Sequence, residues 1–142
     1  MRTVQTMAVR QIFEFTTPDG KTSVSDFLHR LDIKIQIKIG QQLERLCDLT
    51  CPLQPPLIKA FRLDRYKGLY ELRTRSKQTM TCIIFCFDSA DNIILLHGFV
   101  KKQDRSTNQA LEVARARKLA LASKEAFITR KTPQGGSYEK NT

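Results

Sequence analysis

The fold is decided by residues 69–101, which read LYELRTRSKQTMTCIIFCFDSADNIILLHGFVK. Three runs rich in aliphatic, β-branched and aromatic residues follow one another there, and they predict strands at about Leu69–Arg75, Met80–Asp88 and Asn92–Lys101. The connection Asp88-Ser89-Ala90-Asp91-Asn92 has a typical turn composition. We therefore expect the second and third strands to pair as an antiparallel hairpin.

The first of these strands has one charged face and one apolar face. Because side chains alternate along a strand, Glu71, Arg73 and Arg75 share one side, and Tyr70 and Leu72 share the other. We expect the apolar side to be buried under helices and the charged side to be open. A charged row on an open sheet face is suited to a phosphate backbone.

The residues before these strands predict one strand and one or two helices. Residues 10–16 form a β-rich run that ends in a turn at residues 17–20. From about Ser25 to Cys47, apolar residues recur every three or four positions, which indicates an amphipathic helix or helix pair. Residues 33–39 alone alternate as a strand would, but the longer helical period favours the helix.

The carboxy-terminal third predicts a last helix, capped by Ser106 or Thr107 and continuing through about Ile128. We expect a single domain over residues 1–130 and a flexible tail over residues 131–142. The predicted fold class is α+β, a small antiparallel sheet with helices packed on one face.

The net charge of +10 is concentrated in two blocks. Residues 1–58 hold seven basic and six acidic residues, and residues 78–100 hold no Lys or Arg. By contrast, residues 59–77 hold seven basic against two acidic residues, and residues 101–131 hold nine against three. This segregation indicates a polyanionic partner, because each Lys or Arg that meets a phosphate releases condensed counterions. A solvated surface without a partner is the alternative.

Several classes of protein are disfavoured. No run approaches the ~18 apolar residues of a membrane span, and the amino terminus has no apolar segment typical of a signal peptide, so we expect a cytoplasmic protein. The cysteines fall as Cys47/Cys51 and Cys82/Cys86. The second pair lies in a predicted strand, where residues four apart are separated by roughly 13 Å. Buried thiols are therefore favoured over a zinc site or a disulfide, and no metal or cofactor is predicted.

The order of these motifs resembles the phage-derived HigB branch of the RelE/ParE toxin superfamily. Gly68–Arg73 resembles the LWELR-like strand of that branch, Ile83–Phe87 its LYFF-like strand, and Leu95–Lys102 its LLHGFxKK-like strand. The similarity covers about residues 10–128 in element order and is most specific over residues 61–102. It implies a compact RelE-like microbial ribonuclease fold. It also implies a toxin of a type II toxin–antitoxin system that cleaves mRNA without a metal, on the ribosome or free, and a cognate antitoxin, often a helix-turn-helix protein.

Metal-free RNA cleavage uses the 2′-hydroxyl of the substrate as nucleophile, so the enzyme must move protons and stabilise a doubly charged phosphorane. Arg73 is the first candidate, because it lies in the matched motif and a guanidinium binds two phosphate oxygens at once. Arg75 shares its face, and Lys102 belongs to the basic pair of the resembling family. Glu71 is a candidate base, with a structural pairing to Arg73 as the favoured alternative.

Other residues of the basic blocks are expected to contact the RNA backbone or, for the tyrosine, to stack a base or to be structural. They are Arg65, Tyr66, Lys67, Lys77 and Lys101. His97 alternates with apolar residues, which favours a half-buried structural histidine over a catalytic proton carrier. His29 lies among apolar residues of the first helix and is expected to be structural too.

The chain departs from the family pattern at one position of particular interest. Many relatives place a Tyr-Arg pair before the aliphatic strand, and that Arg is often assigned to catalysis, but here Thr81 and Cys82 stand there. Two other functions remain open beside mRNA cleavage. One is a non-enzymatic growth inhibitor, either of the ParE kind that acts on a topoisomerase or a phage host-takeover factor. The other is a catalytically weak RNA- or ribosome-binding module.

Overall fold

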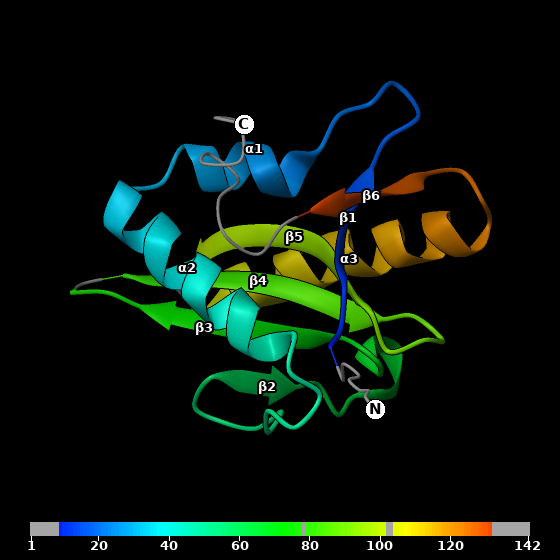
Figure 1. The fold of residues 1–142 in the computed structure, drawn as a ribbon. Helices are drawn as coiled ribbons and strands as arrows, with labels where there is room; N and C mark the ends of the chain where they lie inside the picture. The colour runs from blue at the N-terminus through cyan, green and yellow to red at the C-terminus, as the bar shows by residue number, and fades with distance from the viewer. Residues whose placement is uncertain (1–8, 78, 102–103, 132–142) are drawn as a thin grey trace, which may run out of the picture.

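The computed structural model describes residues 9–77, 79–101 and 104–131. Its strands are β1 (Ile12–Thr16), β2 (Ile58–Ala60), β3 (Tyr70–Arg75), β4 (Met80–Phe87), β5 (Ile93–Lys101) and β6 (Phe127–Lys131). Its helices are α1 (Ser23–His29), α2 (Ile33–Leu46), the short 3-10 helix η2 (Asp64–Tyr66) and α3 (Asp104–Ala122). Figure 1 shows a central sheet with α1 and α2 in front of it and α3 behind it.

The sheet has six strands in the order β2-β3-β4-β5-β1-β6. β4 pairs with both β3 and β5 in antiparallel fashion, which confirms the predicted hairpin. The turn of that hairpin is held by Asp88, whose Oδ1 accepts hydrogen bonds from the backbone nitrogens of Ala90 and Asn92, each at 2.9 Å. β1 lies parallel to β5 and antiparallel to β6, so the sheet is mixed.

The predicted helix pair is confirmed, and residues 33–39 are helical. Each helix begins at a carboxylate. Glu14 accepts hydrogen bonds from the backbone nitrogen of Ser25 at 3.1 Å and from its hydroxyl at 2.7 Å. Asp32 accepts one from the backbone nitrogen of Lys34 at 2.8 Å. These acceptors satisfy free N–H groups in the first turn of each helix. Because Asp32 caps the start of α2, the chain forms two helices there and not one continuous helix.

The predicted last helix is present as α3, but its bounds were wrong. It begins at Asp104, so Ser106 and Thr107 lie within it and do not cap it, and it does not reach Ile128. α3 ends at Ala122, the chain reverses near Lys124, whose φ is 63°, and Ile128 lies in β6 opposite Phe15 of β1. Residues 127–131 form a strand because they pair with β1, which lies near the other end of the sequence. The local helical pattern cannot indicate a contact with such a distant segment. Lys131, assigned to the tail, is the last residue of β6, and residues 132–142 of the predicted tail lie outside the described residues.

The sheet carries an apolar core on each of its faces. One core packs under α1 and α2; it includes Val24, Leu28, Ile39, Leu43, Leu72, Ile83, Phe85, Ile93 and Leu95. The other packs under α3; it includes Phe15, Leu69, Ile84, Cys86, Leu96, Ala110, Leu111 and Ala114. The predicted α+β class is confirmed, but the placement of all helices on one face was wrong. The middle of β4 is buried on both sides, which is why its sequence is a continuous apolar run.

Candidate functional site

Three strands bring cations from both basic blocks onto one face of the sheet. Arg75 at the end of β3 pairs with Met80 of β4, and Met80 pairs in turn with Lys101 at the end of β5. Side chains directly opposite one another on neighbouring strands point to the same face, so Arg75 and Lys101 flank Met80. Arg73 lies two residues earlier on β3 and shares this face.

α3 covers this same face of the sheet at the level of Glu71 and Ile84. Glu71 pairs with Ile84, and Ile84 belongs to the core under α3. Glu71 is therefore fully buried, and the expectation of an open charged face is wrong for this residue. The alternation itself is confirmed, because Tyr70 and Leu72 pack against the core under α1 and α2.

Glu71 holds the Arg73 side chain. Arg73 Nε lies 3.2 Å from Glu71 Oε1, and the Arg73 side chain is 25% exposed whereas that of Glu71 is 0% exposed. Glu71 Oε2 is also buried and accepts no hydrogen bond from the described part of the chain. Because the carboxylate takes Nε, the two terminal nitrogens of the guanidinium are left to meet another anion. A phosphate fits this arrangement, since the terminal nitrogens can contact two of its oxygens.

Cys82 lies directly opposite Arg73 on β4 and is fully buried. Burial raises the pKa of its thiol to about 12, and the Glu71 carboxylate raises it further in the same direction. The thiol is therefore protonated and uncharged at neutral pH. At the position where many members of the resembling branch carry an arginine, this chain offers no positive charge.

His97 and Phe99 lie on β5, on the same face of the sheet as Arg73 and Lys101. Their rings are stacked, with centroids 6.0 Å apart and planes inclined by 10°. Burial, followed by the charge of Arg117, lowers the pKa of His97 to about 4, so its imidazole is neutral at pH 7. Arg117 Nη1 donates to the Leu96 carbonyl at 2.8 Å and lies 3.4 Å from His97 Nδ1. The ring is half-buried, as the sequence indicated.

Arg65 and Tyr66 lie near the start of β3 and are held by Glu112 of α3. Arg65 Nε and Nη2 each donate to the Glu112 carboxylate at 2.7 Å, and the Tyr66 hydroxyl donates to the same carboxylate. The hydrogen bonds from Arg65 are the main cause that lowers the pKa of Glu112 to about 2. This clamp fixes η2 against α3, and Tyr66 is buried. Arg65 and Tyr66, both predicted to contact RNA, therefore bind Glu112 of the same chain.

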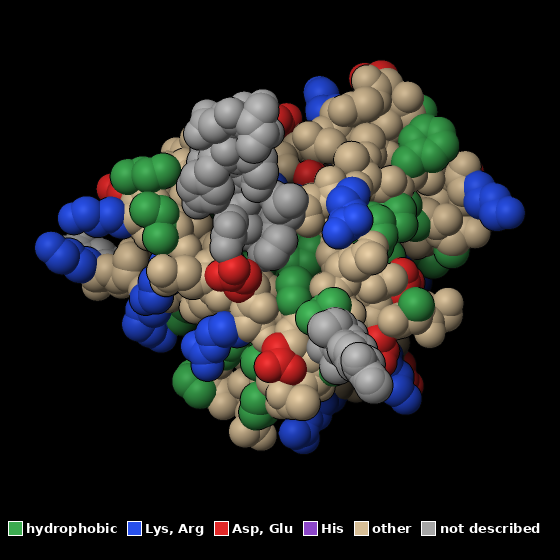
Figure 2. Space-filling view, viewed as in Figure 1, with side chains coloured by type: hydrophobic (Ala, Val, Ile, Leu, Met, Phe, Trp, Pro, Cys, Tyr) green, Lys and Arg blue, Asp and Glu red, His purple; other side chains and the backbone are tan. Residues whose placement is uncertain are grey.

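The remaining predicted residues are exposed or outside the described part. Lys67 and Lys77 are exposed, as is Arg75, and Lys102 lies outside the described residues. Figure 2 shows several Lys and Arg side chains at the side of the molecule where the β3–β4 hairpin ends, with others distributed over the rest of this face. Lys38 of α2 contributes there, because its Nζ donates to the Arg75 carbonyl at 2.7 Å.

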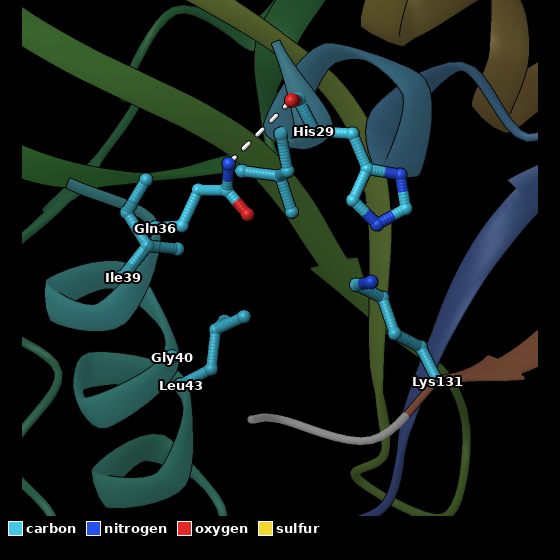
Figure 3. Close-up of a pocket in the computed structure, with 7 residues that line it drawn as sticks. His29, Gln36, Ile39, Gly40, Leu43 and Lys131 are labelled. Atoms are coloured by element: carbon cyan, nitrogen blue, oxygen red, sulfur yellow. Dashed lines mark hydrogen bonds between the residues drawn. The ribbon is translucent and has the colours of Figure 1, made fainter. Parts of the chain in front are cut away.

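A pocket on the opposite side of the sheet does not include any predicted site residue. Its apolar wall is formed by Leu28, Ile39 and Leu43, and its polar rim by His29, Gln36 and Lys131. Figure 3 shows His29 and Lys131 pointing toward one another across its opening. His29 is exposed and is not a core residue, which corrects the expectation for it.

No metal site emerges from the described residues, because no three or more His, Cys, Asp or Glu side chains come together there in a way that could hold an ion. The four cysteines are free thiols, with Cys82 and Cys86 buried on β4. In the same part of the chain, no helix is long and apolar enough to cross a membrane.

The α+β architecture, with a mostly antiparallel sheet between helices, is consistent with a RelE-like fold. Residues 26–119, from α1 into α3, match the family described as "Phage derived protein Gp49-like (DUF891)". The chain therefore belongs to this phage-derived Gp49-like family, which is part of the RelE/HigB group of toxins. None of the curated proteins matches the chain. The matched region contains Glu71, Arg73 and Lys101.

Proposed function

We propose that this protein is the toxin of a type II toxin–antitoxin pair, close to the HigB branch, and that it cleaves mRNA without a metal ion. Family membership supports the toxin class. The observation that supports cleavage is the Arg73 guanidinium, which a buried carboxylate holds through Nε on the same face as Arg75 and Lys101.

The proposed reaction is a transesterification within the RNA. The 2′-oxygen gives its proton to a water molecule and attacks the neighbouring phosphorus, the bond from phosphorus to the 5′-oxygen breaks, and the leaving oxygen takes a proton from Lys102. The products are a 2′,3′-cyclic phosphate and a 5′-hydroxyl. The protein must stabilise the extra negative charge of the phosphorane, and donors that are already in place do so most effectively.

Each site residue has a role in this proposal. Arg73 contacts the phosphorane with its terminal nitrogens, and Arg75 and Lys101 contact the same or the adjacent phosphate. Glu71 is a positioning residue, because its burial keeps it behind Arg73. Lys102, next in the chain, is a candidate proton donor for the leaving oxygen. Lys67 and Lys77 extend the contacts to flanking phosphates. Arg65 adds its positive charge to this surface while Glu112 holds it, and the buried Tyr66 anchors η2.

The experiment is controlled expression of the protein in bacteria, with growth, protein synthesis and mRNA ends measured together. We expect growth arrest, loss of translation and new mRNA fragments that carry 5′-hydroxyl ends. Arg73→Lys should reduce fragment formation, because lysine keeps the charge but lacks the second donor nitrogen. Arg130→Lys on the exposed strand β6 is the matched control and should cleave as the wild type does. Arrest with intact mRNA and a DNA-damage response would contradict the proposal and favour a ParE-like inhibitor.

A non-cleaving RNA- or ribosome-binding protein is the second candidate, and the observation that favours it is Cys82. The neutral, buried thiol supplies no charge where relatives carry an arginine. Purified protein that binds RNA but leaves it uncut under all conditions would select this candidate. In both cases we propose a cognate antitoxin, a helix-turn-helix protein encoded beside this chain, whose co-expression restores growth.

A further inference from the structure

The stacked rings of His97 and Phe99 are not used by the mechanism proposed above. Both side chains are partly exposed, although Phe99 also packs against the core under α3. The reason for the exposure is visible in the strand pairing. β1 pairs with β5 only opposite Ile93, Ile94 and Leu95. Beyond that point, the end of β5 has no paired strand on its β1 side in the described part of the sheet.

The two rings lie within a short distance of the phosphate-binding cations. Phe99 is paired with Cys82, and Cys82 with Arg73, so Phe99 and Arg73 are two strands apart, roughly 10 Å between backbones. Lys101 follows Phe99 by two residues on the same face, roughly 7 Å along the strand. A nucleotide whose phosphate contacts Arg73 or Lys101 therefore has these rings beside its base.

The chemistry of the pair suits a nucleobase better than a second phosphate. Phenylalanine has no charge, and the imidazole is neutral because burial and Arg117 keep its pKa at about 4. Aromatic and histidine rings are the side chains on which unstacked RNA bases are commonly placed, and they accept every base because each has a π-face.

We propose that His97 and Phe99 form a platform on which one base of the bound RNA stacks, next to the phosphate held by Arg73 and Lys101. This inference rests on the proposed function. It names the substrate class more narrowly as single-stranded RNA with an unpaired base, since a base in a duplex cannot reach such a surface.

The test compares two labelled octamers by fluorescence anisotropy with the full-length protein. One is 2′-O-methyl octa-adenylate, which lacks the 2′-hydroxyl nucleophile and is not cut, and the other has the same backbone without bases. The wild type should bind the adenylate more tightly than the abasic octamer by roughly 5- to 100-fold. Phe99→Leu, which keeps an apolar side chain against α3, should abolish most of that preference and leave binding of the abasic octamer unchanged. Phe99→Tyr should retain the preference.

The matched control is Phe13→Leu, because Phe13 is also partly buried against the core under α3 but lies on β1. It should bind both octamers as the wild type does. If a Phe99→Leu protein with wild-type thermal stability keeps the full preference, the platform is overturned. If the wild type binds both octamers equally, the stacking platform is excluded but the proposed binding of the RNA backbone is not. If it binds neither, the proposed function fails as well.

Discussion

Arg73 Nε lies 3.2 Å from Glu71 Oε1, and this contact joins a side chain that is 25% exposed to one that is not exposed at all. Each residue depends on the other. The carboxylate fixes the direction of the guanidinium, and the guanidinium is the closest compensation for a charge that has been removed from water.

Removal of Arg73 should therefore reduce both activity and stability. Arg73→Ala should lower turnover by about 10²–10³-fold, because one positioned donor is lost. It should also destabilise the fold by about 3 kcal/mol, because the buried Glu71 carboxylate is left unpaired. The double variant Glu71→Gln/Arg73→Ala should recover much of the stability but none of the activity. Urea unfolding and growth arrest, measured on the same variants, check this. A stable and fully toxic Arg73→Ala protein would show that the site lies elsewhere.

RNA binding should weaken steeply as salt rises, since the cations at the ends of β3 and β5 displace counterions from the RNA backbone. The logarithm of the affinity should fall linearly with the logarithm of the salt concentration, by about 0.7 per phosphate contact on a single strand. Arg75→Gln and Lys77→Gln should each reduce that slope by about one contact. Affinity that is the same at low and physiological salt would exclude a phosphate-backbone interface.

Cleavage should be insensitive to chelators. The proposed reaction draws its nucleophile from the RNA itself and its charge stabilisation from Arg73 and Lys101, so no ion is required. The measurement is RNA cleavage by purified protein with and without EDTA, at equal ionic strength. Loss of activity in EDTA that is restored by a divalent ion would contradict this mechanism.

Gly98→Ala should destabilise the protein. A Cβ at Gly98 would lie 2.4 Å from Cδ2 of Phe27, a ring of α1 that rests on β5. Overpacking of this kind typically costs about 1–3 kcal/mol. Phe27→Leu in the same chain should recover part of the loss, because the smaller side chain can withdraw. Thermal unfolding of the two variants measures both effects. If Gly98→Ala were as stable as the wild type, the contact between α1 and β5 would be looser than the structure has it.

Stability should fall on mild acidification because of His97. Its pKa in the folded protein is about 4, below the ordinary value of 6.5. Between these values the unfolded chain binds more protons, so the stability contributed by the neutral ring is fully present above pH 6.5 and is lost as the pH falls toward 4. The slope should be at most about 1 kcal/mol per pH unit, since the ring is partly solvated. His97→Gln should flatten this dependence, and urea unfolding at several pH values between 4 and 7 measures it.

β1, β3, β4, β5 and the helix pair were predictable because their signals are local. The alternation in Leu69–Arg75 and the turn at Asp88–Asn92 specify a hairpin without reference to distant residues. β2 and β6 were missed, because a short strand gains its identity from its partner: Ile58 pairs with Leu72, and Phe127 with Thr16. The continuous apolar run of β4 was the signal for helices on both faces.

The candidate site was predictable only in part. Period two placed Glu71, Arg73 and Arg75 on one face, and that holds in the structure. How exposed each of these side chains is could not be predicted from the alternation, because it depends on where α3 packs on that face. The engagement of Arg65 with Glu112 joins residues 47 positions apart, and no pattern within either segment indicates it. His97 and Phe99 could have been recognised as a pair, since they alternate on one strand.

The position of β1 constrains how the protein is made. This strand comes from the start of the domain, yet it lies between β5 and β6, and Ile12 pairs with both Ile93 and Lys131. During synthesis the ribosome must release almost the whole domain before β1 acquires its second neighbour. A chain interrupted before Phe127 leaves one edge of β1 without its partner, with Phe13 and Phe15 on that strand beside an unpaired backbone. Interruption before β6 should therefore produce an aggregation-prone fragment rather than a smaller active protein, because the complete sheet forms only after β6 has been synthesised.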